Sequence, residues 1–77
     1  MIADTENNMI RKYLVGQGKI IRVAGTGVPG AEGLGQPPLE VQLKQPHGVY
    51  VDRKGVLYIA DSWNHRVLKI VPSDPAK

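Results

Sequence analysis

Two histidines, His47 and His65, are the side chains of this sequence best suited to bind a metal ion. A zinc site needs three or four ligands that converge on one point, and Cys thiolates are the other common donors. The chain contains 2 His and 0 Cys, so one copy supplies too few of these ligands. Several copies of His47 could converge only in an assembly of chains. We therefore expect no metal site and no cofactor in a single chain.

Asp4 and Asp61 suggest a carboxylate site, because each is followed by a hydroxyl residue, Thr5 or Ser62. A serine nucleophile requires a general base that a third group holds in place. Ser62 has no evident base, and the neighbouring His65 alone does not complete a triad, so we expect no catalytic residue. A short carboxylate at a turn can instead accept hydrogen bonds from backbone N–H groups of its own turn. Asp4 and Asp61 are therefore predicted to be structural turn residues.

Gly25, Gly27 and Gly30 have the GxGxxG spacing of a dinucleotide-binding loop. Such a loop requires a helix to begin there, since the N–H groups at the helix start face the pyrophosphate. Pro or Gly occupies positions 29, 33, 35, 37 and 38, and this composition does not allow a helix to start. We expect a connection between β elements here and no nucleotide site.

An internal repeat with an offset of 57 residues organises the elements that would position these side chains. Residues 2–15 read IADTENNMIRKYLV, and residues 59–72 read IADSWNHRVLKIVP. Five residues recur unchanged, namely Ile2, Ala3, Asp4, Asn7 and Lys12 as Ile59, Ala60, Asp61, Asn64 and Lys69. The chain of 77 residues therefore holds about 1.35 repeats.

Apolar runs separated by Gly- and Pro-containing turns predict an all-β antiparallel fold. The expected strands are residues 9–15, 19–24, 49–52, 56–60 and 66–71, and residues 2–3 match the end of the strand at 56–60. Residues 53–55 form a tight turn in which Gly55 is placed for a positive φ angle. Residues 39–44 could form one helical turn after two prolines.

The composition offers no disulfide to stabilise so short a chain. It has 9 Gly, 6 Pro, no Cys and 42% hydrophobic residues, so the core must be small or shared with another chain. No apolar run approaches the roughly 20 residues of a membrane span, and we expect no membrane partner. The net charge of +3 comes from scattered basic residues, which does not favour a nucleic-acid partner. The cellular localisation stays open.

The run QPHGVYVDRKGVLYIADSWNHRV at residues 45–67 resembles an NHL repeat. Residues 18–27, GKIIRVAGTG, resemble the outer strand and following loop of the same family. The resemblance implies a β-propeller, in which each blade is a four-stranded antiparallel sheet around a central channel. Leu34 and Trp63 depart from the family pattern at loop positions, where Asp and Gly are usual.

On this resemblance, the chain divides into parts of two blades. Residues 1–24 would supply the end of the second strand, the third strand and the outer strand of a partial blade. Residues 25–46 would be the Gly/Pro-rich connection between blades, and residues 47–77 the inner three strands of the next blade. Because a propeller needs at least about four blades, we expect other chains or a longer protein to complete the fold. Open β edges then favour a homo-oligomer.

The family resemblance implies a binding function carried by loops at one rim of the propeller. His47 would open the innermost strand near the channel mouth, and the turn with Trp63 and His65 would lie on the same rim. We expect a non-catalytic, self-associating module that offers this rim to a protein or other ligand. Two alternatives stay open: a fragment of a lyase- or hydrolase-like propeller enzyme with a metal at the channel mouth, and an RNA-binding propeller.

Overall fold

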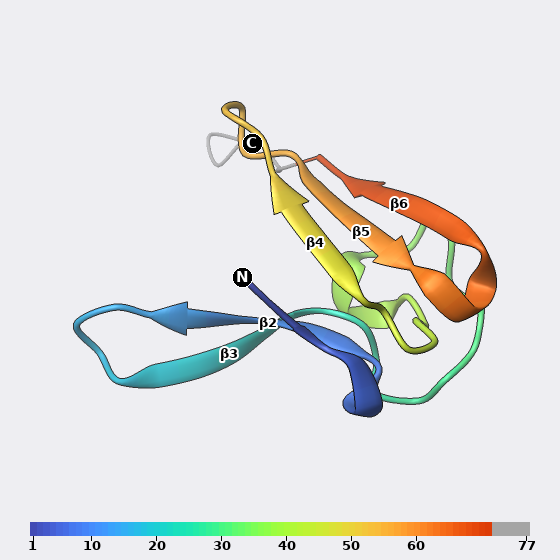
Figure 1. Cartoon of the computed structure of the whole chain (residues 1–77), viewed down its shortest axis with the longest axis horizontal. Coiled ribbons are helices and arrows are strands. Elements are labelled where there is room, and N and C mark those ends of the chain that lie inside the picture. The colour runs from blue at the N-terminus through green and yellow to red at the C-terminus, as the bar shows by residue number, and fades with distance from the viewer. Residues whose placement is uncertain (72–77) are drawn as a thin grey trace.

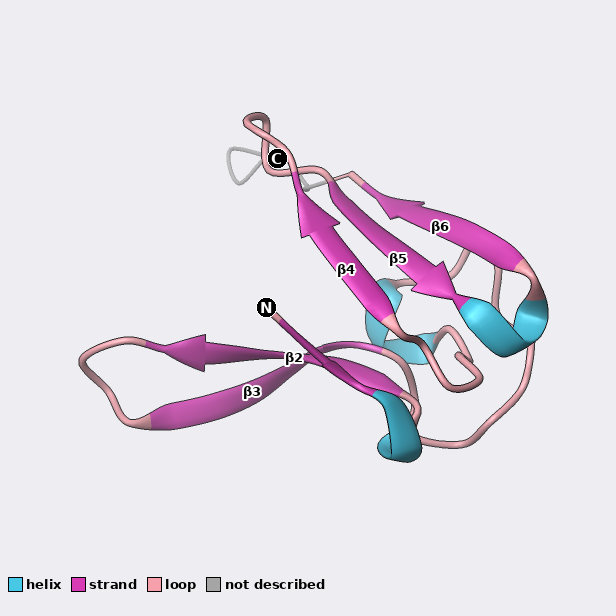
Figure 2. Ribbon diagram, in the orientation of Figure 1, coloured by secondary structure: helices cyan, strands magenta, loops and turns pink. Residues whose placement is uncertain are grey.

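The computed structural model describes residues 1–71 and contains two three-stranded antiparallel sheets (Figure 1). The first sheet has the order β1-β2-β3 and the second the order β4-β5-β6. The strands are β1 (Ile2–Asp4), β2 (Met9–Leu14), β3 (Lys19–Ala24), β4 (Gly48–Val51), β5 (Leu57–Asp61) and β6 (Arg66–Ile70). Three short 3₁₀ turns, coloured cyan in Figure 2, complete the elements, namely η1 (Thr5–Asn7), η2 (Pro38–Glu40) and η3 (Ser62–Asn64). The predicted all-β antiparallel fold is confirmed.

The predicted strands agree with the structure to within one or two residues at each end. The predicted helical turn at residues 39–44 is wrong in position, because η2 begins at Pro38 and ends at Glu40. Proline suits the first position of a helical turn, since its φ angle is already fixed there. Beyond η2 the backbone is extended at Val41, and the carbonyl of Val41 accepts a hydrogen bond from Thr26 N at 3.1 Å. The predicted segment 47–77 includes residues 72–77, which lie outside the described residues.

The two copies of the repeat adopt the same backbone turn between strands. Asn8 ends η1 with φ 58° and ψ 46°, and His65 ends η3 with φ 52° and ψ 44°. In each case the N–H donates to the carbonyl three residues earlier, at 3.2 Å in the first turn and 3.1 Å in the second. Asn and His are enriched among the non-glycine residues that adopt this left-handed conformation. The repeat seen in the sequence is thus also a repeat in the backbone.

The turn between β4 and β5 is built around Asp52. Its Oδ1 accepts hydrogen bonds from Lys54 N at 2.8 Å and Val56 N at 2.9 Å, and Gly55 adopts φ 82°. The Tyr58 hydroxyl donates to Asp52 Oδ2 at 3.4 Å. Burial, and then the charge of Asp52, raise the pKa of Tyr58 above its ordinary value. Tyr58 is therefore a hydrogen-bond donor at neutral pH.

The hydrophobic core lies where the two sheets meet the connection at residues 25–46. Ile10 and Ala24 enter it from the first sheet, Leu57 and Ile59 from the second, and Leu43 from the connection. Burial of each large aliphatic side chain contributes about 1.5–3 kcal/mol. Away from this core, the β2–β3 hairpin projects beyond the second sheet (Figure 1).

The connection is held to the first sheet by long-range hydrogen bonds. Gln45 N donates to Asn8 Oδ1 at 2.9 Å, and Thr5 Oγ1 donates to the carbonyl of Pro46 at 2.8 Å. Both contacts join the η1 turn to the residues that immediately precede β4. The η1 turn therefore fixes the point from which the second sheet starts.

Gly25 stands where β3 turns into the connection, and its neighbours leave no room for a side chain. It has φ 91°, and a Cβ atom there would lie 2.6 Å from the Asn8 carbonyl oxygen and 2.8 Å from Met9 Cα. Both of these atoms belong to the backbone, so neither can move without distorting the first sheet. Gly16 also has a positive φ, 85°, but a Cβ there meets nothing within 4 Å.

We predict that Gly25→Ala lowers the free energy of unfolding by about 2–4 kcal/mol, the sum of a conformational and a steric cost. The matched variant Gly16→Ala has only the conformational cost, about 1–2 kcal/mol. Urea denaturation of both variants measures the difference. Equal losses at the two positions would contradict the close backbone approach at Gly25.

Candidate functional site

Three candidate residues, His47, Trp63 and His65, lie at one end of the second sheet. His47 N donates to the carbonyl of Ala60 at 3.1 Å, so His47 extends the pairing of β4 with β5. Trp63 belongs to η3, directly after β5, and His65 ends that turn. All three residues are exposed, with Trp63 at 57%. The topology brings their backbone segments together without burying their side chains.

Lys44 joins this group, although its position in the sequence gave no signal of it. The Trp63 N–H donates to the Lys44 carbonyl at 3.2 Å, and Lys44 Nζ lies 5.9 Å from the centroid of the Trp63 ring. At this distance an ammonium group is attracted to the face of an indole. We call Lys44, His47, Trp63 and His65 the rim. It combines one exposed aromatic ring with a cation above it.

Beneath the rim, the carboxylate of Asp61 is fully buried and accepts three hydrogen bonds. The donors are Lys44 N at 2.7 Å, Asn64 Nδ2 at 2.7 Å and Arg66 Nε at 2.8 Å. These donors come from the connection, from η3 and from β6. A buried charge is tolerated when it is paired and its lone pairs are satisfied, as they are here.

Arg66 and Asn64 extend this network into the connection. Arg66 donates from its Nη2 to the Gln42 carbonyl at 2.9 Å and from its Nη1 to the Ala31 carbonyl at 3.4 Å. Asn64 Nδ2 also donates to the Gly30 carbonyl at 2.7 Å. The connection is therefore docked on the β5–β6 turn by side chains that Asp61 holds in place.

The hydrogen bonds of Asp4 and Asp61 differ from those expected. Neither carboxylate accepts a bond from a backbone N–H of its own turn. Asp61 occupies the buried face of β5, so its carboxylate points toward the connection instead of back along η3. The side-chain amides of Asn7 and Asn64 supply the bond from each turn instead.

Asp4 occupies the equivalent place in the first sheet but has fewer partners. It accepts hydrogen bonds from Asn7 Nδ2 at 3.0 and 3.1 Å, and its side chain is 24% exposed. Arg11 Nε lies 2.8 Å from Asp4 Oδ2 as an ion pair, yet Arg11 Nε forms no hydrogen bond within the described residues. Lys44 N donates a hydrogen bond to the Asp61 carboxylate, whereas within residues 1–71 no backbone N–H donates to the Asp4 carboxylate.

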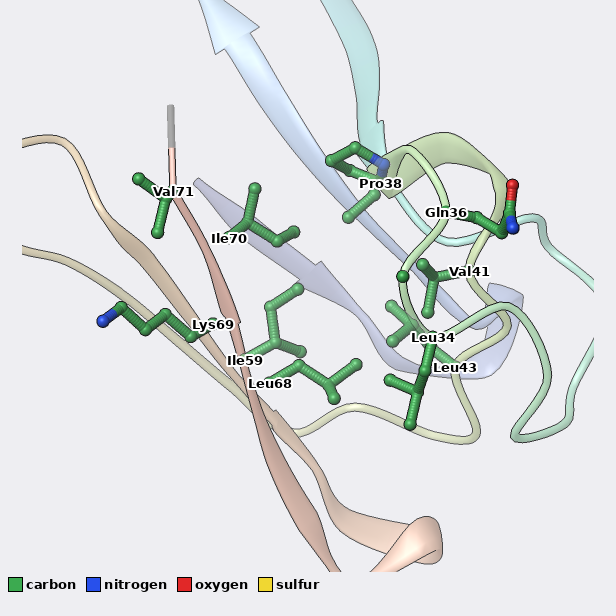
Figure 3. A pocket seen from close by; sticks show the side chains of 12 residues that line it. Leu34, Gln36, Pro38, Val41, Leu43, Ile59, Leu68, Lys69, Ile70 and Val71 are labelled. Carbon is green, nitrogen blue, oxygen red and sulfur yellow. The ribbon is translucent and has the colours of Figure 1, made fainter. Parts of the chain in front are cut away.

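An apolar cavity of about 270 Å³ lies between the connection and the outer part of the second sheet (Figure 3). Leu34, Pro38, Val41 and Leu43 line one side, and Ile59, Leu68 and Ile70 line the other. Gln36 and Lys69 are the polar residues of its lining, and the Lys69 side chain points away from the cavity (Figure 3). Ligand pockets combine an apolar lining with a small number of convergent polar groups, and the residues among 1–71 that line this cavity hold no such convergent group.

The residues proposed for chemistry stay apart or have structural partners. Ser62 Oγ donates to the carbonyl of Ala60 at 3.4 Å. Among residues 1–71 no group of three or more His, Cys, Asp or Glu side chains is arranged to hold a metal ion. Within the same residues, no helix has the length and apolar character needed to cross a membrane.

The difference between Asp61 and Asp4 gives a matched test of the buried carboxylate. We predict that Asp61→Asn lowers the free energy of unfolding by about 3 kcal/mol, because it removes the buried carboxylate and leaves the partly buried Arg66 guanidinium without its counter-charge. Asp4→Asn removes a partly exposed ion pair and is expected to lower the free energy of unfolding by less than about 1 kcal/mol. Thermal denaturation of both variants measures this. If Asp4→Asn lowers the free energy of unfolding as much as Asp61→Asn does, the buried hydrogen-bond network around Asp61 does not account for the loss of stability.

The comparisons with known proteins agree with the geometry of the second sheet. The family model of the NHL repeat matches residues 43–70, from the end of the connection to the end of β6. No curated protein matches the chain. The segment at residues 43–70 thus matches the NHL repeat, and the two three-stranded antiparallel sheets fit the architecture of propeller blades.

Proposed function

We propose that this chain is a non-catalytic propeller module that binds acidic segments of a protein ligand through its rim. The observation that carries the proposal is Trp63, which is 57% exposed although its backbone is fixed to Lys44. A large aromatic side chain on a rigid turn loses little conformational entropy on binding and often anchors an interface. Single exposed apolar residues are common, so the support comes from the rigid backbone and the neighbouring cation together.

The charge of the rim determines the kind of ligand proposed. Lys44 contributes a positive charge beside the indole, and neither His47 nor His65 introduces a negative one. The chain as a whole carries a net charge of +3. Complementary charge mainly increases the association rate and the specificity of an interface. An acidic segment would pair its carboxylates with the Lys44 ammonium, and an apolar residue in that segment would pack on the Trp63 indole.

The proposal also assigns the two sheets to successive blades. Residues 1–24 would provide the end of the second strand, the third strand and the outer strand of one blade, and residues 47–77 the inner three strands of the next. Residues 25–46 would connect them. Within the described residues β1, β3, β4 and β6 each have one paired edge and one unpaired edge. Unpaired edges support self-association of the module.

Binding at the rim can be followed directly, because Trp63 is the only tryptophan in the sequence. We expect a Trp-free, Glu-rich peptide to change the emission of Trp63, and a Lys-rich peptide of equal length to leave it unchanged. Trp63→Ser should weaken binding of the labelled acidic peptide by about 30-fold, the effect of losing an interface anchor of about 2 kcal/mol. Fluorescence anisotropy of the labelled peptide measures this affinity.

The control is Val15→Ser, at a side chain that is 87% exposed in the turn between β2 and β3. It should bind the acidic peptide as the unmodified chain does. Equal affinity for both peptides, or no effect of Trp63→Ser, would contradict the proposal. A single-stranded RNA that binds more tightly, with a steep salt dependence, would favour the RNA-binding alternative. Bound zinc that is lost in His47→Ala would favour the metal-enzyme alternative.

A further inference from the structure

Because the two sheets contain copies of one repeat, the exposed fractions of equivalent residues in the two sheets can be compared. Ile10 is 0% exposed in the first sheet, whereas its equivalent Val67 is 70% exposed in the second. Ile59 is 0% exposed in the second sheet, whereas its equivalent Ile2 is 41% exposed in the first. Each sheet therefore has one face packed in the core and one face exposed to solvent. The exposed faces of the two sheets are formed by different positions of the repeat.

The second-sheet free face follows from strand alternation and register. Leu57, Ile59 and Asp61 point into the core, so Tyr58 and Ala60 point to the opposite side. Tyr58 pairs with Tyr50 and Lys69, and Ala60 pairs with Gly48 and Val67. The second-sheet free face thus consists of Gly48, Tyr50, Tyr58, Ala60, Val67 and Lys69. Tyr50 and Tyr58 lie with ring centroids 6.2 Å apart and their ring planes tilted by 35°, so they form an aromatic pair on this face.

The first-sheet free face follows in the same way. Ala3, Ile10 and Ala24 point into the core, so Ile2, Asp4, Met9, Arg11 and Tyr13 point to the other side. Ile2 and Tyr13 are 41% and 50% exposed. The equivalents of these five residues in the second sheet are Ile59, Asp61, Arg66, Leu68 and Ile70, which pack on the first sheet and the connection. The unsatisfied Nε of Arg11 also lies on this free face.

We propose that the second-sheet free face of one chain docks on the first-sheet free face of a second copy. The support is the contact within one chain, where the face with Ala3 and Ile10 already meets the face with Ile59 and Leu68. On the free faces, Ala60 and Val67 of the second sheet are the repeat equivalents of Ala3 and Ile10. Ile2 of the first sheet is the equivalent of Ile59. The same two kinds of surface can therefore meet between two copies of the chain. This inference rests on the self-association of the proposed function but places the contact on sheet faces instead of open edges.

Such a contact is head-to-tail, because the two faces are different surfaces of the chain. A head-to-tail contact forms a closed ring when the rotation between units completes a circle. Each chain contributes two sheets, and known propellers have about four to eight blades. We therefore expect rings of about two to four copies.

Substitutions on the two free faces test the contact without disturbing the core. Val67→Asp and Ile2→Asp each place a charge on one free face. The control Val15→Asp places the same charge at a position that is 87% exposed and lies on neither face. Light scattering coupled to gel filtration should give multiples of the chain mass for the unmodified chain and for Val15→Asp. Val67→Asp and Ile2→Asp should give the mass of one folded chain, with unchanged circular dichroism.

Mixing the two variants separates head-to-tail docking from other modes of association. The Val67→Asp chain keeps an intact first-sheet free face, and the Ile2→Asp chain keeps an intact second-sheet free face. Their mixture should form a 1:1 complex that grows no further, as measured by native mass spectrometry. Edge pairing would leave both variants oligomeric, and contact between identical faces would let one variant associate with itself. Either result would overturn the proposal.

A folded monomer of the unmodified chain at high concentration would also overturn the inference. That result would leave the proposed function intact, since the rim lies on neither free face. Both Asp variants should bind the acidic peptide as the unmodified chain does. Loss of peptide binding with assembly retained would instead contradict only the rim. The two proposals therefore fail in distinguishable ways.

Discussion

The buried carboxylate of Asp61 is the interaction on which the described structure most depends. It joins backbone from the connection, a side chain from η3 and a guanidinium from β6 at one point. Through Arg66 and Asn64 it also orders the carbonyls of Gln42 and Gly30. A Gly/Pro-rich segment has high conformational freedom when unfolded, and these bonds hold one conformation of it. The rim is rigid because Lys44 and Trp63 lie directly above this network.

The two copies of the repeat show how much of such a site depends on its neighbours. Asp4 and Asp61 precede turns of the same backbone geometry, and each accepts a hydrogen bond from the asparagine three residues later, Asn7 or Asn64. Only Asp61 has a connection beside it, and only Asp61 is fully buried. The sequence of the turn thus determines the backbone geometry, while the packed segment determines whether the carboxylate is satisfied. The same reasoning explains why Ile10 and Val67 differ so strongly in exposure.

Most of the fold could be predicted from the sequence because the signals are local. Alternating apolar residues and Gly-containing turns located the strands, and the positive φ of Gly55 follows from a tight two-strand turn. The offset of 57 residues relates Asp4 to Asp61 through residue identities alone. The helical turn was misplaced because its start depends on long-range backbone hydrogen bonds. Gly25 N donates to the carbonyl of Pro38, and Gln42 N donates to the carbonyl of Glu32.

The candidate site was less predictable, because its contacts join residues far apart in the sequence. Trp63 and the two histidines could be placed on one end of the sheet from strand direction alone. Lys44 could not, since only the bond from Trp63 N to its carbonyl brings it to the indole. The acceptors of Arg66 could not be predicted either, because they are backbone carbonyls and leave no signature in residue type.

The bonds from Thr5 to Pro46 and from Asn8 to Gln45 also have a kinetic consequence. They join residues 41 and 37 positions apart, so they form only after a long loop has closed. The β2–β3 hairpin needs only a short loop to close and can form in microseconds, whereas contacts of high sequence separation slow folding. By the same reasoning the hairpins of both sheets can form early, since β4–β5 and β5–β6 also join neighbouring strands, and the docking of the connection on the first sheet is the slow step.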